Sequence, residues 1–208
     1  MTTGPHMTEF SSVVVASLRE LGFSTNELAY LAITSKIEGA VRDRLAFALH
    51  NKLEGRFVTR EWNRVDLAVL NANRQPDALI ELKAMYTFDP LLKGRYYTDA
   101  TSRDEEKAFG KGGPAAEVYS LLLASHLHAQ VPIDLKQIAK YSSGVNKCLK
   151  QYETHDAVRA AARERVKDEL RGRDLVRNDI LGSGSAFGIE VSVEYWLVRR
   201  AWSKVYEQ

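Results

Sequence analysis

Short apolar runs separated by polar turns dominate the first half of the chain and predict a β-sheet. Val65–Leu70 and Ala78–Leu82 are two such runs, with a polar, proline-containing turn between them. Runs of this length, rich in Val, Ile and Leu and bounded by turn residues, are typical of strands. Arg56–Trp62 alternates more loosely and is predicted to be a third strand, joined to Val65–Leu70 by a tight hairpin.

Apolar residues at helical spacing predict helices on both sides of this region. Ser24 with Glu27, and Ser35 with Glu38, have the spacing of capping boxes, in which each serine begins a helix. The predicted helices cover Phe10–Leu21, a short stretch after Ser24, a longer stretch from Ser35 through Leu49, Leu135–Tyr141 capped by Asp134, and Glu153–Leu170.

Two further strands are predicted later in the chain. Val118–Leu127 is a short apolar run after a polar crossover, typical of a buried strand parallel to an earlier one, although its length also permits a helix. Gly182–Ser185 is predicted to be a flexible loop, and the alternation from Ile189 to Leu197 predicts a one-sided or edge strand. The pattern therefore predicts an α/β fold, with a mixed central sheet of four to five strands flanked by helices.

Length and composition favour one globular domain over residues 8–208, with N-terminal helices at 8–34, a helical insertion at about 134–178 and a last strand at 188–199. Residues Gly4–Met7 have the sequence of a scar left by tag cleavage and are excluded from the fold argument. Cys148 is the only cysteine, which excludes an intrachain disulfide and argues against a thiolate zinc site. The chain contains neither a long apolar run nor a signal-peptide pattern, so we expect a cytoplasmic protein that does not contact a membrane.

Charged side chains in the two central strands suggest a chemistry. Asp66 lies in one run, and Glu81 and Lys83 lie two apart at the end of the other. Residues two apart share a face of a strand, so pairing of these strands would gather the three side chains at one end of the sheet. Mg²⁺ binds through one or two carboxylates together with water and phosphate oxygens. The trio therefore suits phosphodiester hydrolysis, with Lys83 offsetting charge on the phosphate.

This arrangement resembles the PD-(D/E)XK nuclease superfamily, which has the restriction-endonuclease-like fold, over roughly Ser35 to Leu127. Val65 stands where the family usually has proline. The resemblance implies that Asp66 and Glu81 bind Mg²⁺ or Mn²⁺, that Lys83 positions the attacking water, and that Glu38 assists through the metal or the water. It further implies DNA cleavage that leaves a 5′-phosphate, in restriction, repair, recombination or phage defence, and leaves a homodimer open.

Several alternatives compete with this interpretation. Acid-x-Lys also occurs at Glu105 and at Asp134, so the pattern by itself is common. The central trio would then be a structural ion-pair cluster, and Glu38 would only cap its helix. The protein would be a non-catalytic nucleic-acid-binding or assembly module, or an interaction domain that uses the charged helix at 153–170.

Basic side chains near the predicted site are candidate contacts to nucleic acid. Lysines and arginines mixed with aromatics after Lys83 favour a substrate-facing segment, against a plain crossover whose tyrosines pack on the sheet. The candidates are Arg60, Arg64, Lys93, Arg95, Lys107 and Lys111. His126 and His128 would share a face of their strand, but no third metal ligand is evident, which favours a structural or substrate-lining role.

Overall fold

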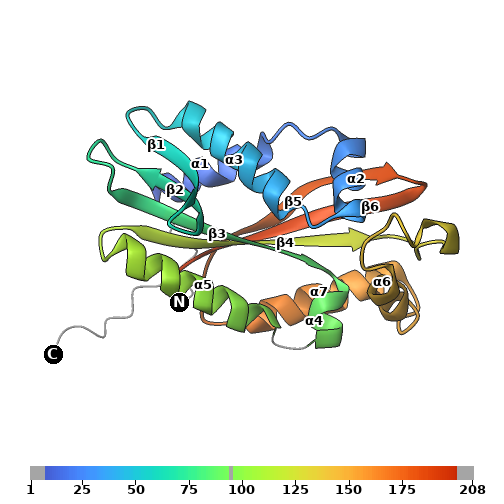
Figure 1. The fold of residues 1–208 in the computed structure, drawn as a ribbon. Coiled ribbons are helices and arrows are strands. Elements are labelled where there is room, and N and C mark those ends of the chain that lie inside the picture. Colours follow the sequence, from blue (N-terminus) through green and yellow to red (C-terminus); the bar gives the residue numbers. More distant parts are fainter. Residues whose placement is uncertain (1–7, 94–95, 201–208) are drawn as a thin grey trace.

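The computed structural model of the protein describes residues 8–93 and 96–200, with side chains throughout except at 93 and 96–100. In this part of the chain a six-stranded sheet, of order β1-β2-β3-β4-β6-β5, lies between two layers of helices (Figure 1). The strands are β1 (Phe57–Trp62), β2 (Val65–Leu70), β3 (Pro76–Tyr86), β4 (Glu117–Leu127), β5 (Asp174–Ala186) and β6 (Ile189–Arg199). The predicted α/β class with a mixed sheet is confirmed, and the sheet has one strand more than the upper limit expected.

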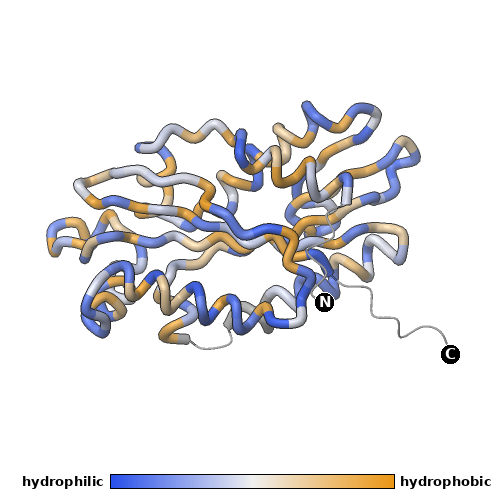
Figure 2. The backbone as a smooth tube through the Cα atoms, turned by 180° about the vertical axis from the view of Figure 1, so that it is seen from behind, coloured by the Kyte–Doolittle hydropathy of each residue, from blue (hydrophilic) through white to orange (hydrophobic). Residues whose placement is uncertain are grey.

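Helices α1–α3 cover one face of the sheet and α4, α5 and α7 cover the other (Figure 1). The first layer contains α1 (Glu9–Arg19), α2 (Thr25–Thr34) and α3 (Glu38–Lys52). The remaining helices are α4 (Phe88–Lys93), α5 (Tyr96–Gly112), the short 3₁₀ helix η1 (Ile133–Leu135), α6 (Ser142–Leu149) and α7 (His155–Glu169). Apolar stretches follow the central strands and polar stretches follow the turns (Figure 2), as expected for a sheet buried on both faces.

Strand pairing follows the predicted pattern in the first half of the chain. β1 and β2 form an antiparallel hairpin in which Trp62 pairs with Val65. The two turn residues, Asn63 and Arg64, have φ angles of 50° and 67°, the left-handed conformation that a two-residue hairpin turn requires. β3 then pairs antiparallel with β2 and parallel with β4, so Val118–Leu127 is confirmed as a strand parallel to an earlier one.

Alternation along β3 decides which way the charged residues point. Ile80, Leu82 and Ala84 belong to the main core beneath α1–α3. Met85 belongs to a second core that contains residues of α7, on the opposite face. Because side chains alternate along a strand, Glu81 points to the same face as Met85, and so does Lys83. That face is the one covered by α5.

The second half of the sheet differs from the prediction. β5 occupies 174–186, where a helical insertion to 178 and a flexible glycine loop were expected. A Cβ on Gly184 would clash with the backbone of Thr25, so this glycine permits close packing of α2 rather than flexibility. β6 is not an edge strand, because it lies between β4 and β5, and α7 covers the face that carries Glu194 and Trp196.

Two helix starts also differ from the prediction. Ser24 caps α2 as predicted, accepting a hydrogen bond from Glu27 N. Ser35, by contrast, ends α2, and α3 begins after Ile37 without a side-chain cap. No α-helix forms over the described residues 135–141. Tyr141 adopts a left-handed φ of 58°, which separates η1 from α6. Within the described residues no helix combines the length and hydrophobicity needed to cross a bilayer.

Candidate active site

Asp66 lies where β2 and β3 separate. The ladder between these strands runs from Leu70 to Leu67, which pairs with Ile80. One position further on, Asp66 Oδ2 accepts a hydrogen bond of 2.8 Å from Leu82 N. The Asp66 carboxylate thus takes the place of a strand partner and is held at the free edge of β3.

Glu38 reaches the same edge from the other layer. It is the first residue of α3, and its Oε2 accepts a hydrogen bond of 2.9 Å from Ala84 N. The alternative that Glu38 only caps its helix is wrong, because the bond goes to β3. Two backbone N–H groups that β2 leaves unpaired are therefore satisfied by two carboxylates, which fixes both side chains.

Glu81 and Asp66 interact directly. The pKa of Glu81 is raised from 4.5 to about 8, first by burial and then by the charge of Asp66 and a side-chain hydrogen bond to it. The charge of Asp104 raises it further, and a hydrogen bond from the Asp66 backbone opposes the shift. Two carboxylates this close cannot both ionise without a compensating cation. With a pKa of about 8, the Glu81 carboxyl is protonated at neutral pH.

Lys83 contacts Asp104 on α5, a carboxylate that the sequence pattern did not single out. Its Nζ lies 3.6 Å from Asp104 Oδ2, and Lys107 Nζ lies 3.6 Å from the other oxygen of Asp104. Asp104 is 21 positions beyond Lys83, on a helix whose docking no local pattern reveals. Its contribution to the site therefore could not be read from the spacing of residues.

Arg42 is a second residue that the sequence pattern did not single out. It lies one helical turn after Glu38 on α3, and its Nη1 is 4.0 Å from Asp66 Oδ1 and 2.8 Å from Glu61 Oε1. The capping pattern at Glu38 did not indicate a role for position 42. Because residues four apart share a face of a helix, however, Arg42 lies on the same side of α3 as Glu38. Arg42 places a positive charge beside the carboxylate pair.

A divalent cation needs oxygen ligands, which the carboxylates of Asp66 and Glu81 could provide. No group of three or more His, Cys, Asp or Glu side chains is arranged to hold a metal ion anywhere in residues 8–93 and 96–200. Glu38 is therefore not gathered with Asp66 and Glu81 into a three-ligand set. The pair itself fits Mg²⁺, which needs only one or two carboxylates, and a cation can displace the proton of Glu81.

The candidate nucleic-acid contacts are distributed around this edge. Arg60 Nη1 lies 3.0 Å from Asp43 Oδ1, and Lys111 Nζ donates to Asn63 O, which ties the end of α5 to the β1–β2 turn. Arg64 is exposed in that turn. Arg95 and the side chain of Lys93 lie outside the described residues, so their role stays a prediction.

The other acid-x-Lys pairs have different surroundings. Glu105 is buried, where Ser120 donates to it and Arg173 pairs with it, so it does not face the edge that carries Asp66. Asp134 is exposed in η1. Glu81, by contrast, interacts with a second carboxylate, that of Asp66.

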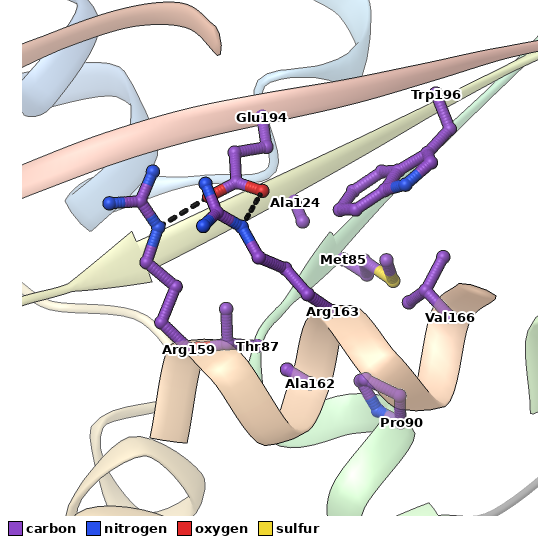
Figure 3. A pocket seen from close by; sticks show the side chains of 10 residues that line it. All are labelled: Met85, Thr87, Pro90, Ala124, Arg159, Ala162, Arg163, Val166, Glu194 and Trp196. Carbon is purple, nitrogen blue, oxygen red and sulfur yellow. Dashed lines mark hydrogen bonds and ion pairs between the residues drawn. The ribbon is translucent and has the colours of Figure 1, made fainter. Parts of the chain in front are cut away.

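A second polar cluster lies at the far end of the same face. Arg159 and Arg163 reach from α7 to Glu194 on β6, with an Arg163 Nε–Glu194 Oε2 distance of 2.7 Å (Figure 3). His126 is buried nearby, and burial, followed by the charges of His128 and Arg159, lowers its pKa to about 3. The ion pairs of Glu194 join α7 to the sheet, and the role of the two histidines stays a prediction.

Comparisons of this chain with protein-family models, with curated proteins and with solved structures give no match. Its function is therefore inferred from the geometry of the site itself.

Proposed function

We propose that this protein is a metal-dependent phosphodiester hydrolase, an endonuclease of the PD-(D/E)XK type that acts on DNA. The observation that carries the proposal is the juxtaposition of Asp66 and Glu81 at the point where β2 and β3 separate, with Lys83 on the same face. Two half-buried carboxylates in contact are costly unless a proton or a cation lies between them. Ionisable groups held in such an unfavourable arrangement cluster at functional sites.

In the proposed hydrolysis, Lys83 and the two carboxylates have different roles. The water oxygen bonds to phosphorus and the bond from phosphorus to O3′ breaks, which leaves a 5′-phosphate and a 3′-hydroxyl that takes up a proton. Lys83 positions the water, and its ammonium offsets negative charge on the phosphate. Mg²⁺ or Mn²⁺, held by Asp66 and Glu81, would supply Lewis-acid stabilisation of that charge.

Backbone hydrogen bonds give this site its rigidity. Asp66 and Glu38 each use one oxygen on a β3 N–H group, at 2.8 and 2.9 Å. A carboxylate has about four lone-pair sites, so each retains acceptor capacity for a cation or a water. Glu38 on this view assists from the α3 side by orienting water rather than by completing a three-carboxylate ligand set.

The same hydrogen bonds favour one alternative, a non-catalytic nucleic-acid-binding module. If Asp66 and Glu38 serve only to satisfy the free edge of β3, and Lys83 serves only to hold Asp104, the cluster is structural. The two functions differ in one property that can be measured directly: only the enzyme requires the negative charge of the carboxylates to bind a divalent cation.

Cleavage assays with matched variants test the proposal. Closed circular, linear duplex and single-stranded DNA are incubated with the protein and Mg²⁺ or Mn²⁺. We expect cleavage by the wild-type protein, and none above background by Asp66→Ala or Lys83→Ala. Asp134→Ala and Lys136→Ala, an exposed acid-x-Lys pair far from the site, serve as controls and should cleave as the wild type does. Retained cleavage in either site variant would refute the proposal.

A further inference from the structure

A cavity lined by three arginines lies on the opposite side of α5 from Asp104. Its volume is about 240 Å³, and it is lined by Ser102, Glu105, Glu106, Gly172, Arg173, Arg199 and Arg200. A water molecule occupies about 30 Å³ in the liquid. The space therefore admits a polar group several times larger than water.

Two of the arginines are fixed by carboxylates. Arg173 pairs with the buried Glu105 and also lies 3.5 Å from the Ser102 hydroxyl. Arg199 pairs with Asp174 at 2.6 Å. These ion pairs neutralise both guanidinium groups and hold them in place, so that little conformational entropy is lost if their remaining N–H groups bind a ligand.

Arg200 supplies charge that is not neutralised in this way. Its guanidinium lies 4.1 Å from the centre of the Phe109 ring and donates to the backbone oxygen of Glu105 at 3.3 Å. No carboxylate pairs with it among the residues that the structure describes. Glu106 also lines the cavity, but it is exposed and free to turn into solvent. The cavity thus contains a guanidinium that forms no ion pair among the described residues, with further N–H donors around it.

The position of the cavity relates it to the candidate active site. Glu81 pairs with Ser120 on β4, and Ser120 pairs with Val198 on β6, next to Arg199. Neighbouring strands are about 4.8 Å apart, so two steps across the sheet span roughly 10 Å. This is the backbone separation of Glu81 and Val198, and α5 lies between the cavity and Asp104.

We propose that this arginine cavity is a binding pocket for a phosphate group. Guanidinium groups present N–H donors in a planar fork that matches phosphate oxygens. The phosphate belongs either to a nucleic-acid chain bound at the candidate active site or to a small ligand such as a mononucleotide. The first source rests on the proposed function, whereas phosphate binding itself does not require hydrolysis.

Calorimetry without divalent metal tests the pocket separately from cleavage. Inorganic phosphate, a 5′-mononucleotide and a short single-stranded oligonucleotide are titrated into the wild-type protein, Arg200→Gln and Lys150→Gln, an exposed control with the same change of charge. We expect at least about tenfold weaker binding of all phosphate ligands to Arg200→Gln, with Lys150→Gln unchanged. Tighter binding of the oligonucleotide than of the mononucleotide would identify the chain as the source, and the reverse order would identify the small ligand.

A second variant protects this test against a folding defect. Ser102→Asp places a negative charge at the cavity wall without removing the Arg200–Phe109 contact, and it should weaken phosphate binding by a similar factor. Thermal melting confirms that each variant is folded. Absence of phosphate binding to the folded wild-type protein would refute the proposal that this pocket binds phosphate. Equal binding by Ser102→Asp and the wild type would refute it as well. Neither result would affect the cleavage test of Asp66 and Lys83.

Discussion

At the residue scale, the central feature of the site is the contact between the carboxyl groups of Asp66 and Glu81. Burial and the neighbouring charge raise the pKa of Glu81 to about 8. Arg42 Nη1 lies 4.0 Å from Asp66 Oδ1 and places a positive charge beside the pair. A divalent cation would displace the proton of Glu81, so metal binding and protonation of Glu81 are linked.

This linkage predicts proton release. At pH 7 the binding of Mn²⁺ should release close to one proton for each cation, and the affinity should rise with pH until the pH passes about 8. Calorimetric titrations in buffers of different ionisation enthalpy measure the number of protons released. Glu81→Gln, which carries no titratable proton, should release none. Release of one proton by Glu81→Gln would show that another group titrates.

The same shift predicts how stability depends on pH without metal. Glu81 has a pKa of about 8 in the folded protein, whereas the ordinary value is 4.5. Between these two pH values the folded state therefore binds a proton that the unfolded state has lost. Its stabilising contribution is complete below pH 4.5 and is lost as pH rises through about 8. Melting temperatures at pH 6 and pH 9 should therefore differ less in Glu81→Gln than in the wild type. Identical differences would contradict the shift.

At the scale of elements, β5 shows where sequence patterns fail. Glycines and serines at 182–185 predict a loop, but Gly184 lies against the backbone of α2 in a long paired strand. Its lack of a side chain serves close packing, which only the tertiary structure reveals. In contrast β2 and β3 were predictable, because their apolar runs and the turn between them are local signals.

Gly184→Ala should therefore destabilise the protein, by about 1–3 kcal/mol, because the added Cβ overlaps the backbone of Thr25. Chemical denaturation measures the change. Gly39→Ala is the matched control, since a Cβ there meets nothing within 4 Å and Gly39 lies in α3. It should leave stability unchanged or raise it by up to about 1 kcal/mol. Equal effects of the two substitutions would argue against close packing at β5.

The contact between α7 and β6 gives a second prediction at this scale. Glu194 has a side-chain exposure of 4% and accepts from Arg159 and Arg163. Glu194→Ala leaves two guanidinium groups without their partner and should lower the free energy of unfolding by about 3 kcal/mol. Glu164→Ala, on the exposed face of α7, should cost less than about 0.5 kcal/mol. A cost for Glu194→Ala as small as that of the control would show that α7 is held by its apolar residues alone.

At the scale of the whole molecule, the sheet brings together residues far apart in the chain. Asp66, Glu81 and Lys83 were predictable as one group because strand alternation and a short turn determine their placement. Glu38 was predictable as a helical glutamate, but its bond to Ala84 N depends on how α3 docks. Asp104 and Arg42 were not predictable, because their contacts arise from the packing of both helical layers around the free edge of β3.

Substitution of Asp66 by asparagine separates the charge of this residue from its structural role. The side-chain amide oxygen of the introduced asparagine can still accept the hydrogen bond from Leu82 N, so Asp66→Asn should melt within a few degrees of the wild type. We predict that it loses Mg²⁺-dependent cleavage of closed circular DNA by more than the roughly 100-fold that a residue beside a metal ligand contributes. Cleavage at the wild-type rate by folded Asp66→Asn would contradict the account and leave the carboxylates a structural role at the edge of β3.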